Sequence, residues 1–319
     1  MEVIAKTEHK DIATVYLAEM SDGRKTEFVE SVQPPLPRNK KWVIIVSSLC
    51  GCPVNCQICD AGGYYRGRLT KDEILAQIDY MVTRRFPDRK IPVDKFKVQF
   101  ARIGEPAFNA NVLEVLSELP SKYDAPGLIA CVSTIAPSGT DDFFRDLLDV
   151  KRTHYHKKFQ LQFSIHTTDR RKRDWLIPVK KWELARIAEY GSAFYEDGDR
   201  KIALNFALAA GMPVDPDVLI KYFKPDNFLI KITPVNPTYK AIANEITSYM
   251  LPGIENYEVA DTLRNAGYEV LLSVGELEEN QIGSNCGQYL LKHMTEKNSL
   301  KSAYTYAVSD LRPKNTGGS

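Results

Sequence analysis

Residues 42–59 read Trp-Val-Ile-Ile-Val-Ser-Ser-Leu-Cys-Gly-Cys-Pro-Val-Asn-Cys-Gln-Ile-Cys, an apolar run followed by a loop that ends in a Cys-x3-Cys-x2-Cys pattern. The apolar run, residues 42–46, has the length and composition of a buried strand. Cys52, Cys56 and Cys59 therefore follow a strand directly. This order is typical of α/β folds, in which functional groups gather at the carboxyl ends of the strands.

The alternation of short apolar runs and helical patterns continues along the chain. Further strands are predicted at residues 97–100, 128–132, 159–165, 202–208, 228–233 and 268–274, and helices at residues 70–84, 110–119, 141–148, 181–190, from 215 onward and 255–265. Thr70 followed by Glu73 forms a capping-box pattern at the start of the first helix. Strands that alternate with helices favour a parallel sheet with right-handed crossovers.

The alternating pattern predicts an α/β protein built as a partial (β/α)6 barrel over residues 41–290. Residues 1–40 are predicted to form a small β-rich extension, with Asp22-Gly23 as a turn. Residues 291–319 are predicted to be a polar C-terminal tail, with disorder at its last three residues.

Composition narrows the class of protein. The chain has 319 residues, 44% of them hydrophobic, and a formal net charge of +1. A charge so near zero does not indicate a dedicated nucleic-acid-binding protein, although RNA is allowed as a partner. The sequence shows neither a membrane span nor a signal peptide, so we expect a cytoplasmic location. Thiols stay reduced there, and the six cysteines are expected to be metal ligands or reactive thiols.

The cysteine triplet has three interpretations. Three thiolates can hold a [4Fe-4S] cluster, which ordinarily takes four cysteines, and three ligands leave one iron open. A structural zinc site would want a fourth protein ligand, and no second Cys/His pair lies nearby. An iron–sulfur electron carrier is the third interpretation, but it needs neither a long α/β chain nor an open iron. The triplet therefore favours a cluster that binds a further molecule.

Several short motifs follow the triplet in a fixed order. They are Cys59-Asp-Ala-Gly62, Gly104-Glu105-Pro106, Ser133-Thr134, Phe163-Ser164-Ile165-His166, Arg173-Asp174, Thr233-Pro234-Val235-Asn236-Pro237-Thr238 and Cys286-Gly287-Gln288. With this ordered set the chain resembles the radical S-adenosylmethionine (SAM) superfamily, and within it the RlmN/Cfr-type (class A) methyltransferases.

The resemblance implies cofactors and site residues. The cofactors would be a [4Fe-4S] cluster on Cys52, Cys56 and Cys59 and SAM, which is cleaved to a 5′-deoxyadenosyl radical. SAM would be bound by residues that follow strands, namely Gly104, Glu105, Ser133, Ser164, His166 and Asn236. Cys286 would carry a methyl group, and Glu30 would be the proton acceptor. An electron donor such as flavodoxin or ferredoxin would be a partner. A turn at Gly104, or strand ends satisfied by backbone at Ser164 and His166, is the structural alternative for these residues.

The chain departs from the resemblance in two places. The RlmN/Cfr type has a second catalytic thiol in the strand before the cysteine loop, where this chain has Ile45; Cys50 and Cys131 are not at that position. An N-terminal RNA-binding domain is also expected to be lacking. We therefore expect RlmN/Cfr-like C-methyl transfer through Cys286. The alternatives are a radical SAM enzyme of the same fold acting on a small molecule, lipid or peptide, and an iron–sulfur electron-transfer protein.

Overall fold

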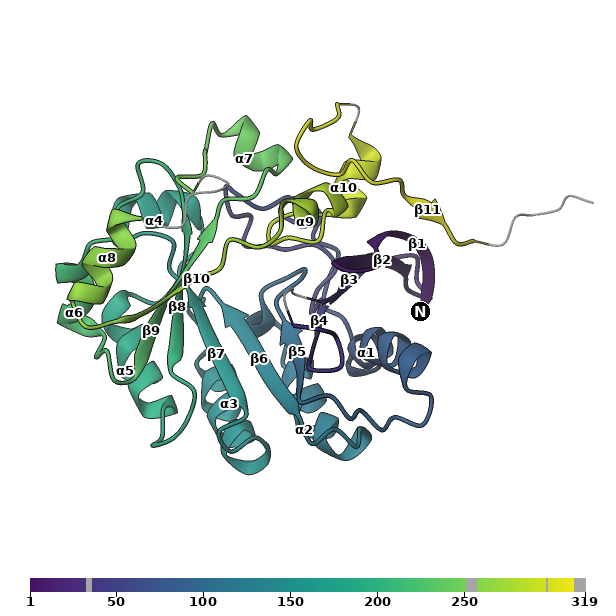
Figure 1. Ribbon diagram of the computed structural model, residues 1–319, viewed down its shortest axis with the longest axis horizontal. Coiled ribbons are helices and arrows are strands. Elements are labelled where there is room, and N and C mark those ends of the chain that lie inside the picture. The colour runs from purple at the N-terminus through teal and green to yellow at the C-terminus, as the bar shows by residue number, and fades with distance from the viewer. Residues whose placement is uncertain (33–35, 251–256, 297, 313–319) are drawn as a thin grey trace, which may run out of the picture.

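The computed structural model describes residues 1–32, 36–250, 257–296 and 298–312. Strands and helices alternate through most of the chain (Figure 1). The strands are β1 Glu2–His9, β2 Ala13–Glu19, β3 Lys25–Ser31, β4 Lys41–Val46, β5 Lys95–Phe100, β6 Leu128–Thr134, β7 Phe159–Ser164, β8 Ile202–Leu208, β9 Phe228–Pro234, β10 Glu269–Leu272 and β11 Ser309–Asp310. The helices are α1 Lys71–Arg85, η1 Pro106–Phe108, α2 Asn111–Lys122, α3 Asp141–His154, α4 Arg170–Leu176, α5 Leu184–Phe194, α6 Pro216–Tyr222, α7 Tyr239–Ala243, α8 Glu258–Asn265, α9 Leu277–Ile282 and α10 Leu290–Thr295.

All the described strands belong to one sheet, in the order β10-β9-β8-β7-β6-β5-β4-β3-β2-β1-β11. Strands β4 to β10 are parallel to their neighbours, while β1 to β4 and β11 pair antiparallel. The sheet curves into an arc with α1, α2, α3 and α5 along its outer side and α9 and α10 on its inner side (Figure 1). The predicted α/β class with a partial parallel barrel is confirmed.

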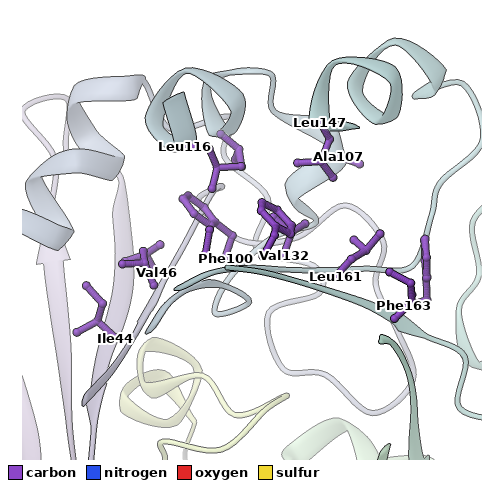
Figure 2. Packing of buried hydrophobic residues seen from close by; sticks show 14 of the residues in the cluster. Ile44, Val46, Phe100, Ala107, Leu116, Val132, Leu147, Leu161 and Phe163 are labelled. Carbon is purple, nitrogen blue, oxygen red and sulfur yellow. The ribbon is translucent and has the colours of Figure 1, made fainter. Parts of the chain in front are cut away.

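The outer face of the arc is apolar. Every second residue of each parallel strand points to this face and packs against the helices in one large core. Figure 2 shows Val46, Phe100 and Phe163 directed to the side that carries Leu116 of α2 and Leu147 of α3. Burial of each such side chain contributes about 1.5–3 kcal/mol, so this face fixes the positions of the strand ends.

The first helix begins where the sequence predicts. The Thr70 hydroxyl accepts a hydrogen bond from the backbone N–H of Glu73 at 3.2 Å, and the Glu73 carboxylate accepts from the N–H of Thr70 at 2.8 Å. This capping box satisfies two of the N–H groups that a helix start leaves unpaired. It fixes the point at which the cysteine loop ends and α1 begins.

Residues 1–40 contain β1, β2 and β3, and the C-terminal segment contains structure that its polar composition did not predict. Within residues 291–319, His293 stacks on Tyr304 with ring centroids 4.6 Å apart. Strand β11 pairs with Ala5 and Lys6 of β1. Such short elements carry no periodic pattern that a sequence reading could detect. The predicted disorder at the last three residues, and the predicted helix start at 255–256, lie outside the described residues.

No helix in the described ranges is long and apolar enough to cross a membrane.

Candidate cluster and SAM site

The cysteine loop lies between β4 and α1 and is held by backbone hydrogen bonds. The N–H of Cys52 donates to the carbonyl of Ala61 at 2.9 Å, and the N–H of Cys59 donates to that of Cys56 at 3.2 Å. Gly51 has φ +70°, and a Cβ there would lie 2.2 Å from the backbone oxygen of Tyr64. Only glycine fits such an approach, so the residue before the first predicted ligand shapes the loop.

The three thiols lie close to one another in apolar surroundings. Cys52 and Cys56 pack against an apolar group that includes Val54 and Ile135, and Cys59 packs against a neighbouring group. Burial raises the pKa of Cys52 to about 11. Burial also raises the pKa of Cys56 and Cys59, and the negative charges of the other cysteines of the triplet raise it further.

This donor set fits an iron–sulfur cluster. Within the described ranges no three His, Cys, Asp or Glu side chains could hold a single metal ion. The cysteines of a cubane cluster bind different irons and therefore need not converge on one point. Thiols whose pKa is raised in the metal-free protein lose their protons when metal binds. Cys52, Cys56 and Cys59 are the residues that would hold the cluster, and this assignment stays a prediction.

Gly104 and Glu105 follow β5. Gly104 has φ +100°, and a Cβ there would lie 2.5 Å from the Leu49 side chain. The Glu105 carboxylate accepts hydrogen bonds from the N–H of Ile135 at 2.9 Å and of Ala107 at 3.1 Å, and from the Thr134 hydroxyl. Burial raises its pKa to about 7, although these bonds oppose the shift. Glu105 therefore ties the ends of β5 and β6 together beside the thiols.

Ser133, Ser164 and His166 lie at the ends of β6 and β7. The Ser133 hydroxyl accepts a hydrogen bond from Nε2 of Gln162 at 3.2 Å. His166 has φ 65°, which is uncommon outside glycine, and its Nδ1 accepts from the N–H of Ala207 at 3.0 Å. Burial lowers the His166 pKa to about 4, with a further lowering from the nearby Arg173. The imidazole is therefore neutral near pH 7, with Nε2 as its remaining donor.

Asn236 links the end of β9 to the loop that carries Cys286. Its Nδ2 donates to the Cys286 carbonyl at 2.9 Å, while its buried Oδ1 has no partner among the described residues. The N–H of Asp60 donates to the Gly287 carbonyl at 2.8 Å. A Cβ at Gly287 would lie 2.7 Å from the Ile58 oxygen, so the two loops touch at their backbones.

The Cys286 thiol shares its surroundings with the cysteine triplet. Cys286 is exposed to solvent, yet the surrounding protein raises the pKa of its thiol, while Arg102 and Lys231 oppose that shift. The charge on Cys286 in turn raises the pKa of Cys56 and Cys59. The structure thus brings together two sequence motifs that lie near opposite ends of the chain.

An ion pair that sequence reading missed holds the Cys286 loop in place. Arg102 donates to the carbonyls of Gly283 at 2.7 Å, Ser284 at 3.0 Å and Asn285 at 2.8 Å. The same guanidinium lies 2.5 Å from the Glu27 carboxylate, and both side chains are buried, with exposures of 3% and 0%. Burial raises the Glu27 pKa, and Arg102 opposes that shift. Neither residue belongs to a recognisable motif, so only the folded chain reveals their role.

Asp60 makes a second contact that the sequence did not predict. Its carboxylate accepts hydrogen bonds from the N–H groups of Tyr239 at 3.1 Å and Lys240 at 3.0 Å. It directly follows Cys59, and its place in a Cys-Asp pair was the available signal. Asp60 therefore fastens the cysteine loop to the segment after β9.

Glu30, the predicted proton acceptor, lies elsewhere. Its carboxylate accepts from Nε1 of Trp42 at 3.0 Å and pairs with Arg85 of α1 at 2.6 Å. Trp42 belongs to the outer core, so Glu30 faces the helices. The other side of β3 presents Glu27 to the Cys286 loop. The structure does not bring Glu30 together with the thiols, because alternation along a strand sends neighbouring residues to opposite faces.

Comparison with known proteins identifies the class. No protein-family profile matches the chain. A solved radical SAM methyltransferase from Sphaerobacter thermophilus has the same fold, with a TM-score of 0.67, 18% identity, and coverage of 90% of this chain and 81% of that one. The chain therefore has the fold of a radical SAM methyltransferase, a class of enzyme whose cofactors are a [4Fe-4S] cluster and SAM.

Within that class the chain is similar to proteins named probable dual-specificity RNA methyltransferase RlmN. The protein from Trichodesmium erythraeum is 26% identical over 85% of this chain and 76% of its own length. The protein from Thermotoga maritima is 26% identical over 88% of this chain and 79% of its own length. The predicted resemblance is confirmed, while the roles of single site residues stay predictions.

Proposed function

We propose that this enzyme transfers a methyl group to carbon through a methylated Cys286, as the RlmN/Cfr resemblance implies. The observation that carries the proposal is the contact between the Cys286 loop and the cysteine loop, in which the N–H of Asp60 donates to the Gly287 carbonyl. A methyl carrier must reach the place where SAM is cleaved. The electrostatic interaction of Cys286 with Cys56 and Cys59 supports this role.

The cysteines of the chain have different roles in the proposed reaction. Cys52, Cys56 and Cys59 would hold the cluster, which when bound reduces SAM and supplies a 5′-deoxyadenosyl radical. The Cys286 sulfur would accept a methyl group from one SAM, with loss of its thiol proton to solvent and release of S-adenosylhomocysteine. Burial raises the Cys286 pKa, and Arg102 and Lys231 oppose that shift, which helps to form the thiolate that attacks.

The neighbouring strand ends would bind SAM. Ser133 and Ser164 present hydroxyls on the inner side of the sheet, and neutral His166 keeps one N–H free to donate. The buried Oδ1 of Asn236 has no partner in the part of the chain that the structure describes. Buried polar atoms without partners are costly unless a ligand satisfies them, which supports assigning these residues to SAM.

This chain lacks the second catalytic thiol of the RlmN/Cfr type. Its absence supports a reaction on the substrate that differs from theirs. Ile45 packs on the inner side of the sheet within an apolar group, and it cannot act as a nucleophile. Cys50 belongs to the outer core. Cys131 is buried in β6 but shares the inner face, where Lys97 and Lys231 lower its pKa against the raising effect of burial. A radical SAM enzyme of the same fold acting on a small molecule, lipid or peptide is therefore the second candidate.

One experiment separates these functions. The cluster is reconstituted without oxygen, SAM and dithionite are added, and both 5′-deoxyadenosine and the mass of the peptide containing Cys286 are measured. We expect 5′-deoxyadenosine, and a Cys286 peptide heavier by one methylene. The variant Cys286→Ala should lack the modification, whereas Cys131→Ala should keep it.

Each negative result of this experiment supports a different function. If 5′-deoxyadenosine forms but Cys286 is never methylated, the second candidate replaces the first. If the cluster assembles and no SAM is cleaved, even when extracts are added as a source of substrate, an iron–sulfur electron-transfer protein is supported. RNA as substrate is tested separately by filter retention at several salt concentrations, because phosphate contacts weaken as salt rises.

A further inference from the structure

The segment around the start of α7 lies against the cysteine loop and is bonded to it. The Thr238 hydroxyl donates to the Ile58 carbonyl at 3.2 Å. Nδ2 of Asn244 donates to the Gln57 carbonyl at 2.9 Å. The first two N–H groups of α7 donate to the Asp60 carboxylate. One short segment after β9 therefore holds the loop between the second and third predicted ligands, and just after the third.

Lys240 extends these contacts to the other half of the loop. Its Nζ donates to the carbonyl oxygen of Asn55 at 2.9 Å and also to Oδ1 of that side chain. Asn55 lies between Cys52 and Cys56. The backbone of Lys240 thus contacts one side of the loop through Asp60, while its side chain contacts the other side.

The contact between Lys240 and Asn55 depends on the local backbone. Asn55 has φ 59°, in the left-handed region that asparagine tolerates better than most residues. A Cβ at Gly62 would lie 2.3 Å from Oδ1 of Asn55 and 3.1 Å from Nζ of Lys240. Glycine at position 62 therefore leaves the space in which the lysine and the asparagine meet. This gives a physical reason for the glycine in the motif Cys59-Asp-Ala-Gly62.

The Lys240 ammonium group brings a positive charge to the loop. In the ranges that the structure describes, its Nζ forms no ion pair with a carboxylate. Burial lowers the pKa of Lys240, and the negative charges of Cys59 and Cys56 oppose that shift. A cluster on three thiolates is anionic, and its reduction adds one more negative charge. A fixed cation stabilises the reduced form more than the oxidised form, and net charge is one of the properties that set the reduction potential.

We propose that Lys240 is a positioning residue whose ammonium group holds the turn at Asn55 and makes the cluster of this loop easier to reduce. The inference rests on the proposed function, because it requires a cluster on Cys52, Cys56 and Cys59. Lys240 acts in two ways, through its hydrogen bonds to the loop and through its charge. The two ways can be separated by substitutions that remove the charge or keep it.

The test compares reduction potentials of the reconstituted, full-length holoenzyme without SAM. The cluster is titrated with dithionite in the presence of redox mediators, and its reduced form is followed by electron paramagnetic resonance. Lys240→Met should shift the potential to a more negative value while the iron content stays the same. In this variant the backbone N–H groups of residues 54–58 should exchange with deuterium about tenfold faster, because a charge-assisted hydrogen bond is lost.

Matched variants separate the charge from the hydrogen bonds and from the fold. Lys240→Arg keeps the charge and the donors, so its potential should be that of the unchanged protein. Lys224→Met removes the charge of an exposed lysine after α6 and should change neither the potential nor the exchange rate. If Lys240→Met does not fold, Lys240→Gln replaces it. Glutamine removes the charge and keeps an N–H donor, so the potential should shift in the same direction.

Three results would overturn the inference. They are equal potentials in Lys240→Met and Lys224→Met, a shift in Lys240→Arg as large as that in Lys240→Met, and an unchanged exchange rate of residues 54–58 in Lys240→Met. Failure of the proposed function is distinguishable, because Cys286 methylation is measured separately in the unchanged protein. A potential shift without methylation leaves Lys240 in its role and removes the methyl carrier. An unchanged protein that holds no iron after reconstitution would overturn the ligand assignment and this inference together.

Discussion

The two faces of the sheet differ in what they contain. On the outer face, Phe100, Phe163 and Phe228 are fully buried against helices. On the inner face, Gln162 and Lys231 are half-buried and bonded to each other. Because neighbouring residues of one strand serve both faces, a single alternating pattern specifies stability on one side and chemistry on the other. We therefore expect substitutions on the outer face to lower the stability of the fold, and substitutions on the inner face to change the chemistry of the site.

The largest effect is expected at the edge of the inner face, where the cysteine loop lies. Changing Cys52, Cys56 or Cys59 to Ala should reduce the iron content of the reconstituted protein from about four per chain to near zero. The brown absorbance and SAM cleavage should be lost with it. Cys131→Ala, which removes an inner-face thiol outside the loop, should keep both. Full iron content in Cys56→Ala would contradict the ligand assignment.

The next effect compares neighbours on β7. Phe163→Ala removes a fully buried ring from the outer core and should lower the free energy of unfolding by about 3–5 kcal/mol. Gln162→Ala removes hydrogen bonds on the inner face and should cost about 1 kcal/mol. Urea denaturation of both variants measures the difference. Equal losses would mean that the inner face is as important for stability as the outer one.

Arg102 is an inner-face residue with a structural task. Arg102→Met leaves Glu27 buried without its cation, at a cost of about 3 kcal/mol by urea denaturation. It also frees the Cys286 loop, so the backbone N–H groups of residues 283–288 should exchange with deuterium faster. Arg145→Met removes an exposed ion pair, with side-chain exposures of 65% and 86%, and should change neither quantity appreciably. An unchanged exchange rate in Arg102→Met would argue against its positioning role.

The smallest effect is a pH dependence at His166. Its folded pKa of about 4 lies below the ordinary value of about 6.5, so the unfolded chain binds more protons between these values. Its stabilising effect is present above pH 6.5 and is lost as pH falls toward 4. Between about pH 7.5 and about pH 5.5, the unchanged protein should lose about 1 kcal/mol more stability than His166→Asn. Asparagine tolerates the positive φ of this position. Parallel losses in both proteins would remove His166 as the cause.

The sequence was sufficient for features that repeat or are spaced regularly. The apolar periodicity located β4 to β10 and most of their helices, and the capping box at Thr70 was correct in both of its hydrogen bonds. The spacing of Cys52, Cys56 and Cys59 indicated their shared chemistry because the loop that joins them is short.

Long-range contacts could not be predicted in the same way. Glu27 and Glu30 look alike in the sequence, and only strand pairing decides which of them faces the Cys286 loop. Arg102 follows β5 as an ordinary charged residue, and its three carbonyl partners come from the far end of the chain.

The late position of the Cys286 loop has a consequence for how the enzyme is made. A chain emerges from the ribosome from its N-terminus onward, and folded units form as they appear. The cysteine loop and the strands around it are synthesised well before residues 283–290, which later cover that loop. We therefore expect the three thiols to be open to cluster assembly during synthesis, before residues 283–290 pack against the cysteine loop.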